Sequence, residues 1–346
     1  MDESTTTDAM RRALTLATRG VEADANPRVG CVLLDEDGRI VGEGWHHGAG
    51  TPHAEVMALR AAGEAARGAT AVVTLETCNH TGHTGPCAQA LIAAGVARVM
   101  HAQADPTSLA GGGAATLRAA GVEVSGGLLA AEAEELNRTW TFARRAGRPF
   151  VTWKFAATLD GRSAAADGTS QWITGSAMRR AMQARRARCG AVVVGTGTVL
   201  ADDPRLTTRE QDDQPLERQP LRVVLGHREV PVAARVRGED GLFRHLTDPD
   251  PTVVLSALAA EGVHHVWLEG GPTLAAAWLR AGAVDEVIAC LAPALLGAGQ
   301  PAVADLGIGT IADTNRLTLL DIERHGDDVA LVLTPVDAST DNPEEK

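Results

Sequence analysis

TPHAEV, residues 51–56, is followed after one helix length and one strand length by LETCNHTGHTGPC, residues 75–87. The first stretch contains a His-x-Glu, and the second contains two of the five cysteines of the chain. Neither stretch indicates a function alone. Together, with a helix and a strand between them, they indicate an α/β domain that carries a metal site with a proton carrier beside it.

The local signals around the first stretch predict the start of a helix. Thr51 supplies a capping hydroxyl, and Pro52 suits the first helical position. We therefore expect His53 and Glu55 to lie in the first turn of this helix. A buried strand is expected to follow at residues 70–76.

The remaining elements alternate between helix and strand along the chain. Pro86 predicts the start of a helix with Cys87 at its N-terminus. In the first half we also expect helices at 8–19, 112–121 and 130–146, strands at 29–34, 39–45, 97–102 and 122–125, and a hairpin turn at 35–38. In the second half we expect helices at 176–188 and 272–281 and strands at 150–161, 191–195, 221–226, 264–270, 285–293 and 329–335.

The chain has 346 residues, which is enough for two domains that each bury a core. RRAGRPF (residues 144–150) is basic and contains Gly and Pro, so we take it as the candidate linker. We expect a first domain at residues 1–146 and a second at residues 147–337. Residues 338–346 are expected to form an acidic disordered tail.

Composition and charge narrow the classes of partner. The formal net charge is −12, from 32 basic and 44 acidic residues, which argues against a broad surface for nucleic acid. No apolar run approaches the length of a membrane span, and the acidic N-terminus lacks the features of a signal peptide, so we expect no membrane partner. The five scattered cysteines are typical of the cytoplasm rather than of a disulfide framework.

A catalytic zinc ion requires three protein ligands and one open position for water. His53, Cys78 and Cys87 offer one imidazole and two thiolates, and the positive end of a helix favours the thiolate of Cys87. Glu55 lies two residues from His53 and can carry protons without binding the metal. This arrangement is typical of zinc-dependent deaminases, in which metal-bound water ionises near neutral pH.

The same residues also admit simpler interpretations. A His-Ala-Glu at a helix start is more often a capped surface turn, and two cysteines can be inert buried thiols. A closed structural zinc site would need a fourth ligand, which nearby only His80 or His83 could supply. The setting of helix, strand, loop and helix favours the catalytic interpretation.

Eight segments keep a family pattern in order and spacing over nearly the whole chain. In the first half they are NPRVGCV (26–32), GEGWHHGAGTPHAEVMALR (42–60) and LETCNHTGHTGPCAQALIAAGVARV (75–99). In the second half they are KFAATLDGR (154–162), SQWIT (170–174), TVLADDPRLTTR (198–209), LEGGPTLAAAWL (268–279) and DEVIACLAPALLG (285–297). These segments resemble the bifunctional deaminase/reductase family of riboflavin biosynthesis. The resemblance implies a cytidine-deaminase-like three-layer α/β/α domain followed by a dihydrofolate-reductase-like α/β domain.

For the first domain, the resemblance implies one zinc ion per chain and hydrolytic deamination of 2,5-diamino-6-ribosylamino-4(3H)-pyrimidinone 5′-phosphate. Oxygen from water replaces the ring amine, and Glu55 passes a proton to the departing ammonia. Asn26, His46 and His83 match positions that bind the pyrimidine nucleotide. His83 stands where the family has Arg or Lys, so its contact with phosphate would depend on pH. Thr77 replaces a proline before the first zinc cysteine.

For the second domain, the resemblance implies reduction of the ribosyl group to ribityl by NADPH, giving 5-amino-6-ribitylaminouracil 5′-phosphate. The positions that match substrate-binding residues are Lys154, Ser170, Arg186, Asp202, Leu206, Arg209 and Glu269. The positions that match cofactor-binding residues are Ala156, Trp172, Thr198, Asp202, Gly271, Pro272, Thr273, Leu274 and Ala275. Lys154 lies within an apolar strand, where its ammonium needs a charged partner such as a phosphorylated sugar or Asp202.

The residues of the second half also support a phosphate site directly. HHVWLEGGPTLAAAWL (264–279) predicts a buried strand, a double-glycine turn and a helix beginning at Pro272, whose backbone N–H groups can bind phosphate. VVVGTGTVL (192–200) is not a dinucleotide fingerprint, because it lacks the third glycine and the downstream acid. Gly226 and His227 replace an Asp-Ser/Thr pair that the family has near the cofactor.

Two other functions are compatible with the sequence. One is a reductase whose zinc site is structural or inactive, an interpretation that rests on Thr77 and His83. The other is a deaminase of nucleic-acid bases, against which the acidic charge, the 3% of aromatic residues and the attached second domain all argue. The resemblance also implies a homo-oligomer.

Overall fold

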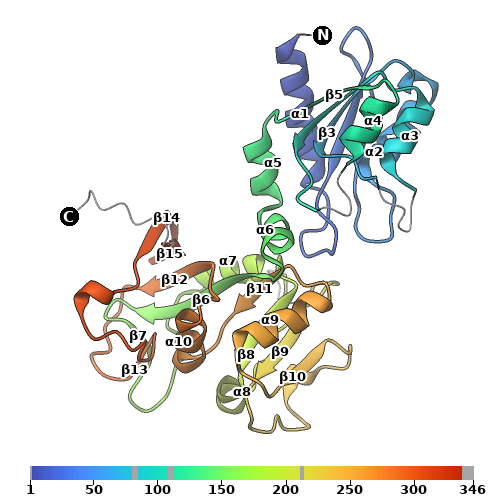
Figure 1. The fold of residues 1–346 in the computed structure, drawn as a ribbon. Coiled ribbons are helices and arrows are strands. Elements are labelled where there is room, and N and C mark those ends of the chain that lie inside the picture. The colour runs from blue at the N-terminus through green and yellow to red at the C-terminus, as the bar shows by residue number, and fades with distance from the viewer. Residues whose placement is uncertain (1, 80–84, 108–111, 211–213, 337–346) are drawn as a thin grey trace. The chain divides into compact units, whose positions relative to one another are not determined.

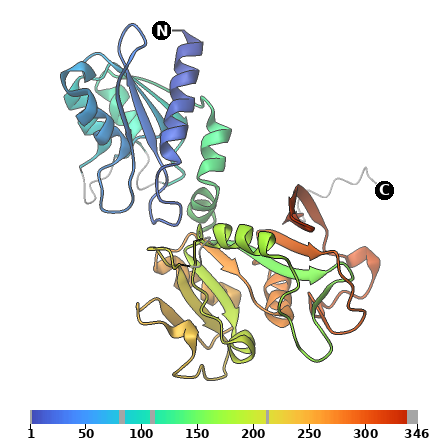
Figure 2. The same ribbon diagram turned by 180° about the vertical axis from the view of Figure 1, so that it is seen from behind.

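The computed structural model describes residues 2–79, 85–107, 112–210 and 214–336. The chain divides into two compact units, Met1–Gly147 and Arg148–Lys346, which Figures 1 and 2 show from opposite sides. None of the described helices has both the length and the apolar character needed to cross a membrane. The tail expected at 338–346 lies outside the described residues.

The first unit is built on a five-stranded sheet of order β2-β1-β3-β4-β5. β1 pairs antiparallel with both β2 and β3, whereas β3, β4 and β5 are parallel. The expected hairpin therefore joins β1 to β2. The strands are β1 (Gly30–Leu34), β2 (Ile40–Trp45), β3 (Thr70–Leu75), β4 (Arg98–Gln103) and β5 (Glu123–Gly126).

Helices cover both faces of this sheet and make three α/β/α layers. One face packs against α1 (Glu3–Ala17) and α5 (Ala130–Leu136). The other face packs against α2 (Ala54–Ala62), α3 (Cys87–Ala94) and α4 (Gly113–Ala119), as Figure 1 shows. Because both faces are covered, every residue of β1 and β3 is buried, and these strands are apolar apart from Thr70 and Thr74 of β3.

Two helix starts differ from those predicted. The first helix begins at Glu3 rather than at residue 8, because the Asp2 carboxylate accepts a 2.7 Å hydrogen bond from the Thr5 N–H and caps it. α2 begins at Ala54 with His53 as its N-cap, rather than at Pro52. The Thr51 hydroxyl does not cap this helix, since it donates to the carbonyl of Gly48 at 2.7 Å.

The helix predicted at residues 130–146 is two helices, α5 and α6 (Arg138–Ala146), which meet at Asn137. The buried Asn137 side chain accepts from the N–H of Arg28 and donates to its carbonyl, both at 2.9 Å. These bonds hold Asn137 at φ −112° and ψ 23°, which interrupts the helix. The predicted linker is also too long, because only residues 147–149 separate α6 from the next strand.

The second unit is built on an eight-stranded sheet of order β10-β9-β8-β11-β6-β12-β15-β14. The strands from β10 to β12 are parallel, and β15 and β14 extend the sheet antiparallel. The carboxyl ends of the parallel strands therefore share one edge, where ligand sites form in such sheets. The strands are β6 (Phe150–Thr158), β8 (Ala191–Gly195), β9 (Leu221–Leu225), β10 (Phe243–Leu246), β11 (His265–Leu268), β12 (Glu286–Ala292), β14 (Leu317–His325) and β15 (Asp328–Pro335), beside a separate pair, β7 (Arg162–Ala164) and β13 (Gln300–Pro301).

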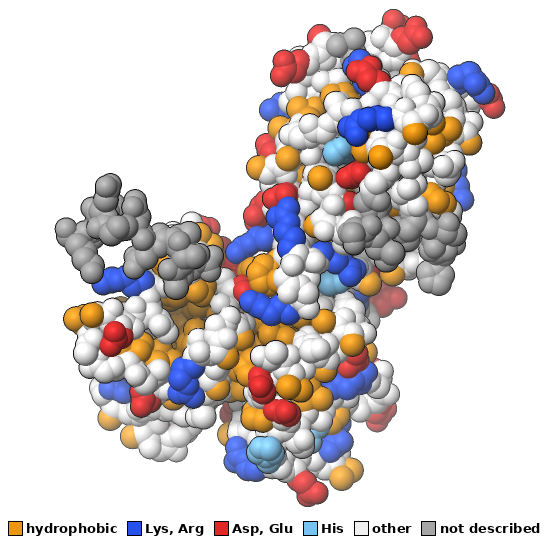
Figure 3. Space-filling model, in the orientation of Figure 1, with side chains coloured by type: hydrophobic (Ala, Val, Ile, Leu, Met, Phe, Trp, Pro, Cys, Tyr) orange, Lys and Arg blue, Asp and Glu red, His pale blue; other side chains and the backbone are white. Residues whose placement is uncertain are grey.

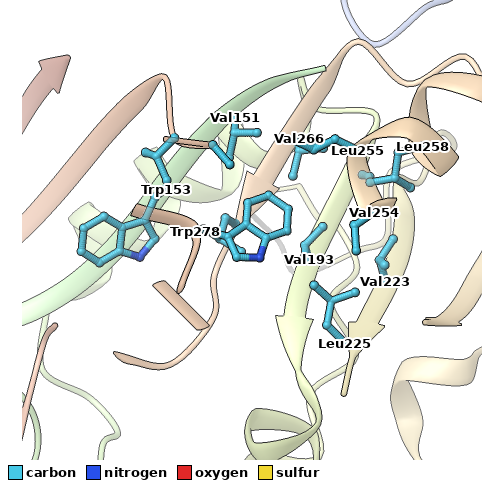
Figure 4. Packing of buried hydrophobic residues seen from close by; sticks show 14 of the residues in the cluster. Val151, Trp153, Val193, Val223, Leu225, Val254, Leu255, Leu258, Val266 and Trp278 are labelled. Carbon is cyan, nitrogen blue, oxygen red and sulfur yellow. The ribbon is translucent and has the colours of Figure 1, made fainter. Parts of the chain in front are cut away.

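Two cores lie on the two faces of this sheet. α9 (Pro251–Ala260) and α10 (Pro272–Arg280) cover one face, and α7 (Ser176–Arg186) and α8 (Thr196–Asp202) cover the other. Figure 4 shows the first core, where Trp278 lies among valines and leucines of β8, β9, β11 and α9. Short 3-10 helices occur at Gly63–Ala66, Arg235–Arg237 and Ile311–Asp313.

The surface of the second unit is partly apolar. In the view of Figure 3, hydrophobic side chains gather over this unit, while charged side chains of both signs occur on both units. The large exposed hydrophobic residues of the edge strand β14 are Leu317, Leu319, Leu320 and Ile322.

Candidate active sites

His53, Cys78 and Cys87 meet at the ends of three elements. His53 caps α2, Cys78 follows β3, and Cys87 opens α3. The Nδ1 atom of His53 lies 3.5 Å from the Sγ of Cys78 and 3.3 Å from the Sγ of Cys87. A tetrahedral zinc ion with ordinary bond lengths spaces such atoms roughly 3.5 Å apart. The donor set therefore fits zinc, and within the described residues it is the only cluster of three such ligands.

The start of α3 holds Cys78 in this position. The N–H of Cys87 donates to the Sγ of Cys78 at 3.5 Å, and the N–H of Ala88 donates to its carbonyl at 3.3 Å. These N–H groups have no acceptor within their own helix, and the N-cap residue Pro86 offers no side-chain cap. The positive end of the helix is thus directed at a thiol that must become a thiolate.

The two thiols differ in acidity. A hydrogen bond with Cys87 is the main reason that the pKa of Cys78 falls to about 4; burial opposes this effect, and a hydrogen bond with His53 adds to it. The hydrogen bond with Cys78 is the main reason that the pKa of Cys87 is raised, and burial is the second. The surroundings therefore favour a thiolate at Cys78, the form that binds a cation, rather than at Cys87 as expected from the sequence.

Glu55 lies beside this cluster in the first turn of α2 and is only 4% exposed. Burial, followed by the negative charge of Cys78, raises the pKa of Glu55 to about 7, although hydrogen bonds and the charge of His53 act in the opposite direction. A carboxyl group with such a pKa can both accept and release a proton at neutral pH. This is the property that the proton carrier of a deaminase needs.

Asn26 and His46 form a pair next to the metal ligands. The Nε2 atom of His46 lies 3.1 Å from the Nδ2 of Asn26, and its Nδ1 lies 3.2 Å from the carbonyl oxygen of Pro52. Because a carbonyl only accepts, Nδ1 carries the proton and Nε2 accepts from the Asn26 amide. Burial lowers the pKa of His46, which favours this neutral form, and its ring meets that of His53 at 5.4 Å between centroids. His83 lies outside the described residues.

The loop that carries Cys78 rests against α4. A Cβ atom on Gly113 would lie 1.8 Å from the carbonyl oxygen of Thr77, which immediately precedes Cys78. We expect Gly113→Ala to displace this loop at a cost of about 1–3 kcal/mol and to lower zinc affinity by about tenfold. Competition with a chromogenic chelator measures this change, and the reductase rate of the same protein serves as its control. Unchanged zinc affinity would show that the loop does not depend on α4.

In the second unit, Lys154, Arg186 and Glu269 form a charged cluster. Arg186 on α7 donates to the carboxylate of Glu269, which directly follows β11, and Lys154 lies on the neighbouring strand β6. Burial acts to raise the pKa of Glu269, but the charges of Arg186 and Lys154 and hydrogen bonds from Arg186 and Trp267 outweigh it and lower the pKa. The charge of Lys154 thus acts on the Glu269 carboxylate, whose ion pair is with Arg186.

Arg186 retains an unused donor. One of its terminal nitrogens, Nη1, reaches the carbonyl of Thr207 at 3.5 Å, while its Nε is buried and has no acceptor among the described residues. A buried guanidinium N–H without an acceptor is costly in a folded protein. A ligand could contact only the part of the side chain that is exposed, which is 16%, and the role of Arg186 stays a prediction.

Trp172 and Ala156 have different surroundings. The indole of Trp172 is 69% exposed, and the guanidinium of Arg179 lies over it, 4.4 Å from the ring centroid. Ala156 is a half-buried residue of β6 that packs against the core under α7. Arg179 could not be singled out from the sequence, because one arginine in a basic helix resembles any solvated charge.

The start of α10 fits a phosphate group. Gly271 is its N-cap, with open space where a Cβ would be, and the helix begins without a capping side chain. Pro272 has no N–H, and the N–H of Ala275 already donates to the carbonyl of Gly271 at 3.1 Å. The N–H groups of Thr273 and Leu274 remain as donors for a diphosphate.

The other predicted residues of the second unit lie on or near α8 and in one loop. Ser170 is half-buried between β7 and α7, Thr198 is half-buried in α8, and Asp202 is exposed at the end of α8. Leu206 is buried and has φ +55°, a conformation rare for a large side chain and often associated with functional sites. Arg209 donates to the hydroxyl of Thr207 at 3.2 Å. The contacts of these residues with ligands stay predictions.

The departure from the family at Gly226 has a structural reason. Gly226 follows β9 with φ +126°, and a Cβ there would lie 2.8 Å from the hydroxyl oxygen of Thr196. The backbone of this turn therefore requires glycine, and the exposed His227 is left as the first side chain after the strand.

Comparison with known proteins identifies the family. Residues 3–103 match the zinc-binding region of cytidine and deoxycytidylate deaminases, and residues 149–331 match the RibD C-terminal domain. Over 308 residues the chain is 50% identical to the riboflavin biosynthesis protein RibD of Mycobacterium tuberculosis H37Rv, covering 89% of this chain and 90% of that protein. The chain belongs to the RibD family.

Other RibD proteins agree with this assignment over the full length. RibD of Escherichia coli K12 is 45% identical over 359 residues, which cover 94% of this chain and 98% of that protein. The structure of Acinetobacter baumannii RibD superposes with a TM-score of 0.91 at 39% identity, covering 97% of this chain and 100% of that one. The Thermotoga maritima deaminase/reductase gives 0.85 at 31% identity, with 96% and 99% covered.

The predicted fold class and activities are confirmed. The first unit is a cytidine-deaminase-like domain with a zinc site, and the second is a dihydrofolate-reductase-like domain that binds NADPH. RibD enzymes are bifunctional deaminases and reductases of riboflavin biosynthesis, and this chain has both halves. The presence of the zinc deaminase domain favours the bifunctional enzyme over a reductase with an inactive zinc site.

Proposed function

We propose that this enzyme deaminates 2,5-diamino-6-ribosylamino-4(3H)-pyrimidinone 5′-phosphate and then reduces the ribosyl group of the product to ribityl with NADPH. The T. maritima protein is described as a diaminohydroxyphosphoribosylaminopyrimidine deaminase and 5-amino-6-(5-phosphoribosylamino)uracil reductase, and it matches both units. The observation that carries the proposal is the cluster of His53, Cys78 and Cys87 with the buried Glu55 beside it.

In the first step, this chain supplies ligands, orientation and a proton carrier. His53, Cys78 and Cys87 would hold zinc, which supplies a Lewis acid that activates water when it is bound. Glu55 takes a proton from the attacking water and delivers it to the departing ammonia, which its pKa of about 7 allows. Asn26, held by His46, faces the pyrimidine, and His83 contributes to nucleotide binding.

In the second step, charged residues bind the sugar phosphate and place it against NADPH. The substrate-binding residues in this proposal are Lys154, Ser170, Arg186, Asp202, Leu206, Arg209 and Glu269. The cofactor-binding residues are Ala156, Trp172, Thr198, Asp202 and the turn from Gly271 to Ala275. The deaminase domain spans residues 1–146 and the reductase domain residues 147–337, which agrees with the division into two compact units within a residue.

The variant Arg186→Met tests the reductase part of this proposal. We expect the KM for the deaminated nucleotide to rise by about tenfold or more, because a charged hydrogen-bond donor to the sugar phosphate is lost. The KM for NADPH should stay unchanged. Arg180→Met is the matched control, since Arg180 is an exposed arginine of the same helix. Equal effects of the two variants, or a rise confined to the KM for NADPH, would contradict the assignment.

A homo-oligomer is supported by the edge of the second sheet. Leu317, Leu319, Leu320 and Ile322 of β14 are 38–58% exposed, and β14 is the last strand of the sheet among the described residues. An exposed apolar edge strand in a native protein is normally covered by a partner, and a second copy of the chain is the simplest one. Light scattering coupled to gel filtration, with Leu319→Glu as the disrupting variant, distinguishes a monomer from an oligomer.

A cytoplasmic location is supported by the cysteines. All five belong to the described residues, all are buried, and none forms a disulfide. Thiols that must bind zinc persist where the compartment is reducing. Fractionation of the producing cells tests this location.

A further inference from the structure

Trp267 makes a hydrogen bond to Glu269 that has no role in the two proposed reaction steps. It lies in β11, is 1% exposed, and packs in the core under α7. Its indole N–H donates a 2.7 Å hydrogen bond to the Oε1 of Glu269. The two residues are two positions apart in extended chain, so their side chains point to the same face of the sheet.

This hydrogen bond distinguishes Trp267 from the other large buried indoles. The Nε1 atoms of Trp140, Trp153 and Trp278 are buried and have no acceptor among the described residues. Trp278 is as deeply buried as Trp267 and lies in the opposite core, where Figure 4 shows it surrounded by aliphatic side chains. The polar atom of Trp267 is therefore engaged with the charged cluster, whereas that of Trp278 is not.

The two oxygens of Glu269 have different partners. Trp267 donates to Oε1, and Arg186 donates to Oε2. A carboxylate rotates easily about its last torsion angle, and a donor held in the core beside one oxygen restricts that rotation. Trp267 is buried in its core, so its indole restricts the plane of the Glu269 carboxylate and, through it, the position of the Arg186 guanidinium. The Arg186 side chain is 16% exposed, and this exposed part can contact a ligand.

We propose that Trp267 is a positioning residue of the reductase, which orients Glu269 and through it Arg186 to receive the phosphorylated sugar of the nucleotide. This inference rests on the proposed role of Arg186 and Glu269 in substrate binding. Trp267 itself touches no substrate. Its hydrogen bond already restricts the rotation of the Glu269 carboxylate in the free enzyme. Less conformational entropy is therefore lost when the nucleotide binds.

The variant Trp267→Phe tests this role in the full-length enzyme, because it keeps an aromatic ring and removes the N–H donor. It also removes part of the buried indole volume, a loss that the control variant below shares. Calorimetry with the deaminated nucleotide should show a dissociation constant raised by about tenfold, the effect of one lost hydrogen bond to a charged group. The dissociation constant of NADPH should not change. Trp278→Phe is the matched control, since it makes the same substitution at a buried indole without an acceptor, and it should leave both constants unchanged.

A double-mutant cycle with Glu269→Gln separates positioning from a general structural effect. If Trp267 acts through Glu269, adding Trp267→Phe to Glu269→Gln weakens nucleotide binding far less than it does in the wild type. If the two substitutions raise the dissociation constant of the nucleotide by factors that simply multiply in the double variant, the proposal is overturned. It is also overturned if Trp267→Phe binds the nucleotide as Trp278→Phe does. If Glu269→Gln binds the nucleotide as well as the wild type does, the proposed role of Glu269 fails, and the positioning role fails with it. If nucleotide binding is weakened in Glu269→Gln but normal in Trp267→Phe, only the positioning role is refuted.

A second measurement covers the case in which Trp267→Phe does not fold. The indole nitrogens of the protein are labelled with ¹⁵N and observed by NMR. One indole N–H resonance should differ between the wild type and Glu269→Gln, and the same resonance should shift in the wild type when the deaminated nucleotide is added. The absence of any indole resonance that responds to both changes overturns the proposal.

Discussion

Glu55→Gln is expected to reduce deamination by at least about 100-fold, the contribution typical of a general acid–base group. The reason is chemical rather than structural, because glutamine has nearly the same volume and cannot carry the proton. Glu55 is not among the three clustered ligands, so the variant should still bind one zinc ion per chain. Its reductase activity on nucleotide that is already deaminated should be unaffected.

Ammonia release measures the first activity, and NADPH oxidation with the deaminated nucleotide measures the second. Glu64→Gln serves as the control, since Glu64 is an exposed carboxylate of the same domain. Deamination at the wild-type rate in Glu55→Gln would refute its role as proton carrier. Loss of zinc from that variant would instead mean that Glu55 helps to build the metal site.

Removal of a zinc ligand should have the other large effect. We expect Cys87→Ala to lower zinc affinity by more than roughly 100-fold, since even outer-shell partners of metal ligands contribute 10–100-fold. Deamination should fall to the background, because the chemistry depends on the metal. The reductase domain contains none of the three ligands and should keep its rate.

Cys31→Ala is the matched control for this experiment. Cys31 is also a fully buried cysteine of the first unit, but it belongs to the core of β1 rather than to the ligand cluster. Metal analysis after dialysis against a weak chelator should find zinc in the control and none in Cys87→Ala. Full zinc content in Cys87→Ala would contradict the assigned ligand set.

The zinc site was predictable from the sequence because its parts are local. His53 and Cys87 stand at helix starts that Pro52 and Pro86 signal, and Cys78 follows the buried strand between these helices. The local geometry was predicted less well. Pro52 precedes the cap instead of opening the helix, because helix-start signals fix a boundary only to within a residue or two.

The reductase site depends on contacts that no local pattern carries. Arg186 and Glu269 are 83 positions apart in the chain, and their pairing follows from the order of the strands in the sheet. Their roles came from the resemblance to a family, not from spacing. The hydrogen bond of Trp267 to Glu269 could not be predicted at all, because it depends on the rotamers of two buried side chains.

The break between α5 and α6 and the edge strand β14 could not be predicted from local sequence patterns either. The interruption at Asn137 is caused by the backbone of Arg28, which is 109 positions away. β14 escaped prediction because it is exposed along most of its length and has a bulge between Leu319 and Asp321, which disturbs the alternation of apolar and polar residues. α9 was missed although Asp250 caps it and Pro251 opens it.

Mass spectrometry of the zinc-loaded enzyme with the diaminopyrimidine nucleotide, with and without NADPH, tests the central claim most directly. Without NADPH we expect exchange of one amine for oxygen, and with NADPH we expect the further addition of two hydrogens. A substrate that returns unchanged in both reactions, while nucleotide that is already deaminated is reduced, would contradict the bifunctional account. In that case the cluster of His53, Cys78 and Cys87 would be a zinc site without turnover.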